Sequence, residues 1–230
     1  MDAIIVDSVP LQLNFDELCQ RLRVNVESAR AEEVKLLVEQ AEAIARPKGL
    51  YKLGFIDEKG DDYIVVDGLP FKSRILRVNV GETQRVFFFV ATCGEELDSW
   101  ASSRPSLLLR YYAETIQEIA LQRAFEALEA DIQERYRSGK TAIMTPGSLE
   151  DWPLSEQLSV FAILGDPRAK VGVDLNDSFL MKPMKSVAGV IFSTQLNFES
   201  CQLCPREGCS GRRSPYEPDL YAKRYAAHDL

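Results

Sequence analysis

The chain has 230 residues, of which 46% are hydrophobic, so it can bury a sizeable core in one large domain or two small ones. Its formal charge of −8 argues against nucleic-acid binding, which needs a concentrated basic face. The longest apolar runs, such as 86–91 and 187–192, are far shorter than the roughly 18 residues that span a bilayer, and the start resembles no signal or transit peptide. We therefore expect a cytoplasmic protein with neither a nucleic-acid nor a membrane partner.

The first fifty residues predict a short strand and two helices. The strand is expected at residues 3–6, and Asn14 is a candidate N-cap for a helix over residues 15–22. Apolar positions that repeat every three or four residues predict a second helix over residues 27–45, and Pro47 ends it.

Between residues 50 and 91 the apolar period changes to two, which is typical of strands. Strands are expected at residues 51–55, 63–66, 75–80 and 86–91, and the last of these is apolar enough to be central in a sheet. Short turns that contain glycine separate them, which favours antiparallel hairpins.

The second half of the chain mixes helices and strands. A long core helix is predicted over residues 106–136, because this stretch has no Gly or Pro and carries an apolar stripe. A short strand at 142–145, a helix at 155–164 and strands at 170–175 and 186–194 are expected to follow. The order of elements indicates an α+β fold.

The final segment differs in composition from the rest of the chain. It is rich in Pro and Gly and has no periodic apolar face, so it needs an additional constraint to be ordered. We predict a main α+β domain over residues 1–198 and a cysteine-rich tail over residues 199–230 that packs on it.

Clustered cysteines in the tail predict a metal or iron–sulfur centre. Cys201, Cys204 and Cys209 have C-x2-C-x4-C spacing, which lets one turn aim three sulfurs at a common point. Three arginines supply positive charge that favours thiolates: Arg206, Arg212 and Arg213. The cluster is compatible with an iron–sulfur cluster, a structural zinc ion, or reduced thiols that include a redox pair.

A closed centre needs a fourth ligand, and Cys93 is the first candidate because it ends the predicted central strand. Cys93 is equally compatible with a small core residue. Cys19 and His228 are the reserve candidates. Because His228 is the chain's one histidine and lies close to the C-terminus, histidine-based acid–base catalysis is not expected.

A polar turn at residues 144–153 is the second constellation of interest. Pro146 and Gly147 form a turn between a strand and a helix, a place where ligand loops often occur. The alternative is a plain connection with Trp152 packed as a hydrophobic plug. The chain contains no glycine-rich phosphate loop, no H-E-x-x-H motif and no nucleophile elbow.

Three segments taken together, residues 88–98, 145–154 and 185–190, resemble stand-alone homologues of the activation domain of cobalamin-dependent methionine synthase. The resemblance covers most of residues 5–195. It implies an α+β fold around a curved, mainly antiparallel sheet flanked by helices. It also implies S-adenosylmethionine binding and docking on the cobalamin domain, where inactive cob(II)alamin is reduced and remethylated.

The resemblance places the cofactor-binding residues in the polar turn. The expected residues are Thr145, Pro146, Gly147 and Asp151. Ile143 stands where the family has an arginine, and Ser148 stands where it has a tyrosine. Loss of a cationic anchor weakens recognition of the ligand's carboxylate unless another arginine replaces it.

The resemblance and the cysteines together imply an accessory protein for cobalamin-dependent methionine synthesis or corrinoid methyl transfer. The expected partner is a corrinoid-binding protein or the catalytic subunits of methionine synthase, and the partner presents the cobalamin. An iron–sulfur cluster in the tail would suit this role, because such clusters reach very low potentials. The alternatives are a non-catalytic binding module with structural zinc and, less favoured, an S-adenosylmethionine-dependent methyltransferase.

Overall fold

The fold is built around β5 (Arg85–Thr92), a strand that is buried on both faces of the sheet. The computed structural model describes residues 2–195, 197–209 and 212–226. Successive strand side chains point to opposite faces. Accordingly, the even-numbered apolar residues of β5 join one core cluster, whereas Phe87 and Phe89 join a different one.

β5 lies inside an antiparallel seven-stranded sheet with the order β4-β3-β2-β5-β9-β6, in which β1 also pairs with β2. β2 (Lys48–Lys59) and β9 (Ser186–Ser193) are its direct neighbours. The other strands are β1 (Ile4–Val6), β3 (Tyr63–Val66), β4 (Leu69–Lys72) and β6 (Thr141–Met144). A separate two-stranded sheet contains β7 (Asp174–Leu175) and β8 (Met181–Lys182).

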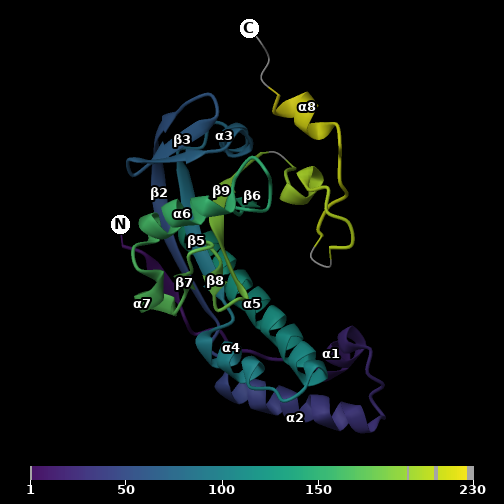
Figure 1. The fold of residues 1–230 in the computed structure, drawn as a ribbon. Helices are drawn as coiled ribbons and strands as arrows, with labels where there is room; N and C mark the ends of the chain where they lie inside the picture. The colour runs from purple at the N-terminus through teal and green to yellow at the C-terminus, as the bar shows by residue number, and fades with distance from the viewer. Residues whose placement is uncertain (1, 196, 210–211, 227–230) are drawn as a thin grey trace.

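Helices flank the sheet on both sides (Figure 1). The long helix α5 (Leu107–Tyr136) packs Leu128 and Ile132 against the face that carries Phe87 and Phe89. The opposite face packs against α3 (Arg74–Val80), α6 (Gln157–Leu164) and α7 (Pro167–Val171), and the 3-10 turn η1 (Leu154–Glu156) leads into α6. Beyond the sheet, the first half of α5 packs with α1 (Phe15–Leu22), α2 (Ala29–Ile44) and α4 (Glu95–Ser102). None of the helices in the described ranges has the length and apolarity needed to cross a bilayer.

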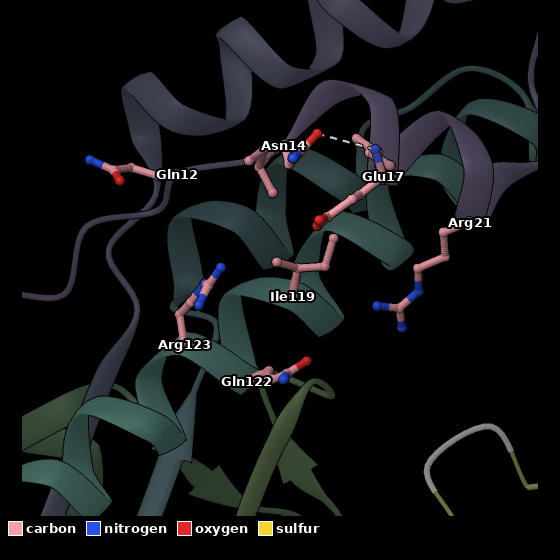
Figure 2. Close-up of a pocket in the computed structure, with 9 residues that line it drawn as sticks. Gln12, Asn14, Glu17, Arg21, Ile119, Gln122 and Arg123 are labelled. Carbon is pink, nitrogen blue, oxygen red and sulfur yellow. Dashed lines mark hydrogen bonds between the residues drawn. The ribbon is translucent and has the colours of Figure 1, made fainter. Parts of the chain in front are cut away.

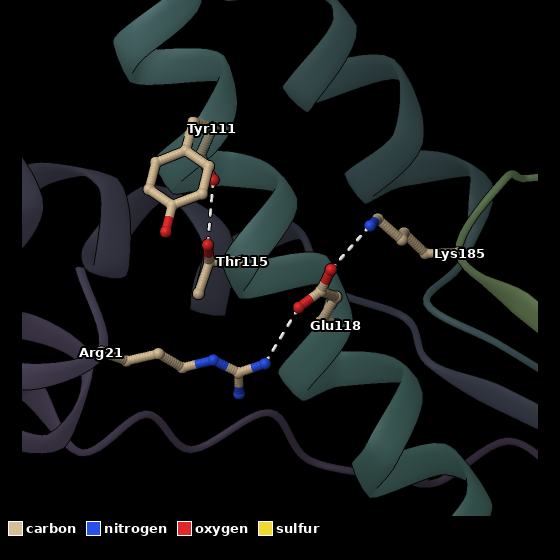
Figure 3. Close-up of polar contacts among 5 residues, drawn as sticks. All are labelled: Arg21, Tyr111, Thr115, Glu118 and Lys185. Carbon is tan, nitrogen blue, oxygen red and sulfur yellow. Dashed lines mark hydrogen bonds and ion pairs between the residues drawn. The ribbon is translucent and has the colours of Figure 1, made fainter. Parts of the chain in front are cut away.

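Glu118 of α5 joins three parts of the chain through ion pairs (Figure 3). Its two carboxylate oxygens lie 2.9 Å from the Arg21 guanidinium of α1 and 2.8 Å from Lys185 Nζ, just before β9. The Lys185 carbonyl also accepts a hydrogen bond from the Cys93 amide at 3.0 Å. Lys185, which belongs to one of the three recognised segments, therefore has a structural role in fixing the start of β9.

Most of the predicted elements are confirmed. Asn14 caps α1 by accepting hydrogen bonds from the amides of Asp16 and Glu17. The helices over residues 27–45, 106–136 and 155–164 are present with slightly different ends, and the most apolar strand is central as expected.

One strand prediction is wrong, and a second is correct only at its end. Residues 75–80 form helix α3, because the Ser73 side chain caps the Leu76 amide at 3.0 Å and the buried positions follow helical spacing. Residues 170–172 belong instead to α7 and its end, since Asp166 caps this helix, Pro167 begins it and Gly172 ends it in the left-handed region, so the strand β7 is confined to Asp174–Leu175.

Gly189 allows β6 and β9 to approach each other closely. A Cβ atom at this position would lie 2.2 Å from the Met144 carbonyl oxygen, and backbone atoms cannot yield as a flexible side chain can. Met144 ends β6 and leads directly into the polar turn. Gly189 therefore fixes the position of that turn against the sheet.

We predict that Gly189→Ala lowers the free energy of unfolding by about 1–3 kcal/mol, which is the usual cost of overpacking. Urea titration followed by circular dichroism measures this change. Gly49→Ala is the matched control in another strand, because the three atoms nearest to its new Cβ all belong to the Leu128 side chain, with Cδ1 at 2.9 Å. An equal or smaller loss for Gly189→Ala would contradict this account.

Candidate functional site

The tail packs beside β6 and is anchored by aromatic residues (Figure 1). Phe198 and Tyr225 are buried in the main core cluster, and Tyr225 is fully inaccessible. The Tyr225 hydroxyl donates a hydrogen bond to Asn79 Oδ1 of α3 at 3.1 Å, and the Arg74 guanidinium donates to the Tyr225 carbonyl. The tail includes the 3-10 turn η2 (Ser200–Leu203) and α8 (Leu220–Arg224).

Arg212 holds the cysteine segment in shape. Its guanidinium donates to the carbonyls of Cys201 at 3.0 Å, Cys204 at 3.1 Å and Ser214 at 3.2 Å, and also to the carbonyl of Arg206. A guanidinium presents five N–H donors in a fixed plane and is always charged. The Arg212 side chain therefore supplies part of the constraint that orders the tail, a role that the sequence analysis gave to a bound metal.

A cleft of about 620 Å³ separates the cysteine segment from the sheet and α5. Its apolar side comes from β5, α5, β6 and β9, with Phe89, Phe125, Ile143 and Val187. Its polar side comes from the turn after β6 and from the tail. The polar lining residues are Thr145, Gly147, Ser148, Ser200, Cys201, Cys204, Arg206, Cys209 and Arg213. We call this the cysteine cleft.

The polar turn that borders the cysteine cleft is held by backbone hydrogen bonds. The Gly147 amide donates to the Trp152 carbonyl at 2.7 Å, and the Ser148 amide donates to the Thr145 carbonyl at 3.2 Å. Gly147 has φ = +81°, a backbone conformation that glycine adopts without strain. Trp152 is completely buried, as expected if it packs as a hydrophobic plug. The turn itself nevertheless faces the cleft.

Two arginines of the tail bring positive charge into the cysteine cleft. Arg206 is exposed and makes no side-chain hydrogen bond or ion pair within the described part of the chain. Arg213 pairs with Glu199 at 3.0 Å, which leaves further N–H donors on its guanidinium. Its charge also opposes the rise in the pKa of Glu129 on α5 that burial causes. The cleft is therefore suited to a ligand that combines an anionic group with some apolar surface.

The four residues expected to bind a cofactor have different surroundings. Thr145 and Gly147 line the cysteine cleft, whereas Pro146 is buried beneath the turn. Asp151 faces away from this cleft and caps α3, where it accepts hydrogen bonds from the Ile75 amide at 3.1 Å and from the Ser73 hydroxyl. Sequence reasoning did not place Phe125 or Ser200 in a site, because only the fold brings α5 and the tail together.

The three tail cysteines line one cleft, but Cys93 is elsewhere. Cys93 is fully buried in the cluster formed by α1, α2, α4 and the first half of α5. Burial, followed by the nearby Asp98 carboxylate, raises the pKa of Cys93 to about 12, whereas a metal ligand must be a thiolate. Cys19 is buried in the same cluster, and His228 lies outside the described residues.

The described residues do not fit a closed four-ligand centre. Among residues 2–195, 197–209 and 212–226, no group of three or more His, Cys, Asp or Glu side chains is arranged to hold a metal ion. The prediction that Cys93, Cys201, Cys204 and Cys209 bind one metal is therefore not supported. What the structure does bring together is three thiols on one cleft wall.

A smaller pocket of about 190 Å³ lies between α1 and α5 (Figure 2). Its two arginines are already paired, Arg21 with Glu118 at 2.9 Å and Arg123 with Glu126 at 3.1 Å. Its Asn14 side chain is the cap of α1. These groups have structural partners, so this pocket is a weaker candidate than the cysteine cleft.

Comparisons with known proteins bear on the fold. No protein-family model matches the chain, and no curated protein matches it. A solved structure, the crystal structure of the MetH reactivation domain bound to AdoHcy, is similar with a TM-score of 0.57 and 16% identity. The alignment covers 86% of this chain and 81% of that chain. The expected α+β fold, with an antiparallel sheet flanked by helices, is confirmed.

We predict that Arg212→Ala loosens the cysteine segment without unfolding the sheet. Hydrogen bonds to a charged group are worth about 1.5–3 kcal/mol each, and the substitution removes several at once. Hydrogen–deuterium exchange should accelerate in residues 200–209 and stay unchanged in β5. Arg206→Ala is the control, because its side chain has no such partners among the described residues. Unchanged exchange in Arg212→Ala would refute this role.

Proposed function

We propose that this chain is a cytoplasmic accessory protein of cobalamin-dependent methionine synthesis or of another corrinoid methyl-transfer system. It docks on a corrinoid protein and supports the reductive activation of that protein's cobalamin. The observation that carries the proposal is a fold similar to the MetH reactivation domain over 86% of the chain, combined with the cysteine cleft beside the recognised turn. Within this function, the cleft binds S-adenosylmethionine or its product AdoHcy.

The cleft has the size and chemistry for such a ligand. A volume of about 620 Å³ falls within the roughly 300–1,000 Å³ of small-molecule sites. Phe89, Phe125 and Val187 offer apolar surface for the adenine ring and the aliphatic chain beside the sulfur atom. The hydroxyls of Thr145 and Ser148, which are hydrogen-bonded to each other, lie on the polar side, where they can meet the polar groups of the ligand.

Tail arginines replace the cationic anchor that the recognised turn lacks at Ile143. Arg206 and Arg213 approach the turn from the tail, and an arginine binds a carboxylate through two parallel N–H donors. The tail thus completes the ligand site and is part of the functional unit. Under this proposal, residues 1–198 and the tail at 199–230 each contribute residues to one ligand site.

A second candidate function rests on the three thiols that line one cleft wall. A zinc ion held by Cys201, Cys204 and Cys209 would make the chain a binding module that recognises a corrinoid protein without chemistry of its own. An iron–sulfur cluster on the same thiols would instead add a redox centre. Both need a rearrangement of these three cysteines, which are not arranged to hold a metal ion in the described structure, and at least one further ligand.

Titration with AdoHcy tests the ligand claim. We expect 1:1 binding by calorimetry, and the double variant Arg206→Ala, Arg213→Ala should weaken it roughly 10- to 100-fold, as the loss of charge-assisted hydrogen bonds implies. Arg168→Ala is the control, since Arg168 lies on α7 with its side chain 78% exposed and paired with Asp174. Wild-type affinity in the double variant would show that the tail arginines do not bind the ligand.

Metal analysis after anaerobic purification separates the two candidate functions. Because Arg212 and Tyr225 already order the tail, we expect Cys204→Ser to keep the protease resistance of residues 199–226. Stoichiometric zinc in the wild type, with rapid cleavage of the Cys204→Ser tail, would favour the structural-zinc module. Iron with acid-labile sulfide would favour a redox centre.

A further inference from the structure

A second cleft, of about 500 Å³, lies on the other side of the polar turn from the cysteine cleft. The start of α3 and the turn form one wall, and the part of the tail that leads into α8 forms the other. Its floor is apolar, with Ile75, Leu149 and Leu203. We call it the tyrosine cleft, because Tyr216 and Tyr221 line it and each remains 44% exposed.

The polar groups of the tyrosine cleft are acidic. Glu150, Asp151 and Glu217 line it, and no Lys, Arg or His does so among the described residues. Asp151 is already engaged as the cap of α3, and Glu217 Oε1 accepts a hydrogen bond from Gln202 at 2.8 Å. Glu150 has no hydrogen bond or ion pair within the described ranges, so its charge is available to a ligand.

The neighbouring cysteine cleft has the opposite charge. Ser148 lines both clefts, so only the turn and the adjoining tail segment separate a site with two arginines from a site with three carboxylates. The two clefts therefore favour ligands of opposite charge.

We propose that the tyrosine cleft is a docking site for a basic segment of a partner protein. An arginine side chain of that segment lies beside the rings of Tyr216 and Tyr221, with its guanidinium directed to Glu150 and Glu217. Stacking on an aromatic face and pairing with carboxylates both favour arginine. The apolar floor accepts the aliphatic stem or a neighbouring apolar side chain.

Three observations favour this occupant over others. The carboxylates alone would not form a binding site, but they rim a cavity with an apolar floor and two exposed aromatic rings. An anionic or nucleic-acid ligand would meet only negative charge here. The chain as a whole carries a formal charge of −8, which attracts a basic partner from a distance.

Fluorescence anisotropy with a defined probe tests the proposal on the full chain. The probe is a fluorescein-labelled peptide in which two arginines alternate with leucines, and the comparison peptide carries glutamates in place of the arginines. At low ionic strength we expect the arginine peptide to bind at least about fivefold more tightly, with affinity falling as salt rises. Equal binding of the two peptides would overturn the proposal.

Variants locate the binding. Glu150→Gln and Tyr216→Ala should each weaken binding of the arginine peptide by about three- to tenfold, in line with exposed ion-pair and cation–π contributions. Glu207→Gln is the matched control, because Glu207 is an exposed carboxylate of the tail that lines neither cleft.

An equal loss in Glu207→Gln would show that net charge, and not this cleft, attracts the peptide, and wild-type affinity in Glu150→Gln would likewise contradict the proposal. The probe contains neither a corrinoid nor an S-adenosyl group. Failure of this experiment therefore leaves the proposed function intact, and failure of the AdoHcy titration leaves the docking site intact.

Discussion

Burial of β5 on both faces is the constraint on which the rest of the structure depends. Its Phe87 and Phe89 require cover from α5, and its even-numbered side chains require cover from α3 and α6. The same strand then reaches Cys93 and Gly94, where φ = +94° turns the chain into α4. Because Phe89 also lines the cysteine cleft, the central strand supplies both the core and one wall of the candidate site.

The order of the tail depends on a small number of protein groups. Tyr225 is buried against α3, and Arg212 binds carbonyls along the cysteine segment. These contacts divide the space beside the polar turn into a cationic cleft and an acidic cleft. A metal on Cys201, Cys204 and Cys209 would add to this order.

Local pattern predicted the elements whose signals are strong. The long apolar stripe of α5, the Asn14 cap and the apolar run of β5 all have the predicted structure. A strand was predicted wrongly at residues 75–80 because their apolar content suits a strand. The cap at Ser73 and the distant Asp151 carboxylate stabilise a helix there. The spacing of apolar residues along the sequence contains no information on such tertiary contacts.

The site was predictable in part, for a similar reason. The turn at Thr145–Gly147 and the cysteine cluster were visible as motifs, and both line the same cleft. The separation of Cys93 from the cluster, and the approach of Arg206 and Arg213 to the turn, follow from where the tail packs. Spacing along the chain contains no information on that packing.

Amide hydrogen exchange of the full chain, with and without saturating AdoHcy, tests the central claim most directly. A ligand in the cysteine cleft contacts both walls, so exchange should slow in residues 143–148 and in residues 200–209, while α1 and α2 stay unchanged. Absence of protection in either segment, or protection confined to the α1–α5 pocket, would contradict a ligand site formed jointly by the polar turn and the tail.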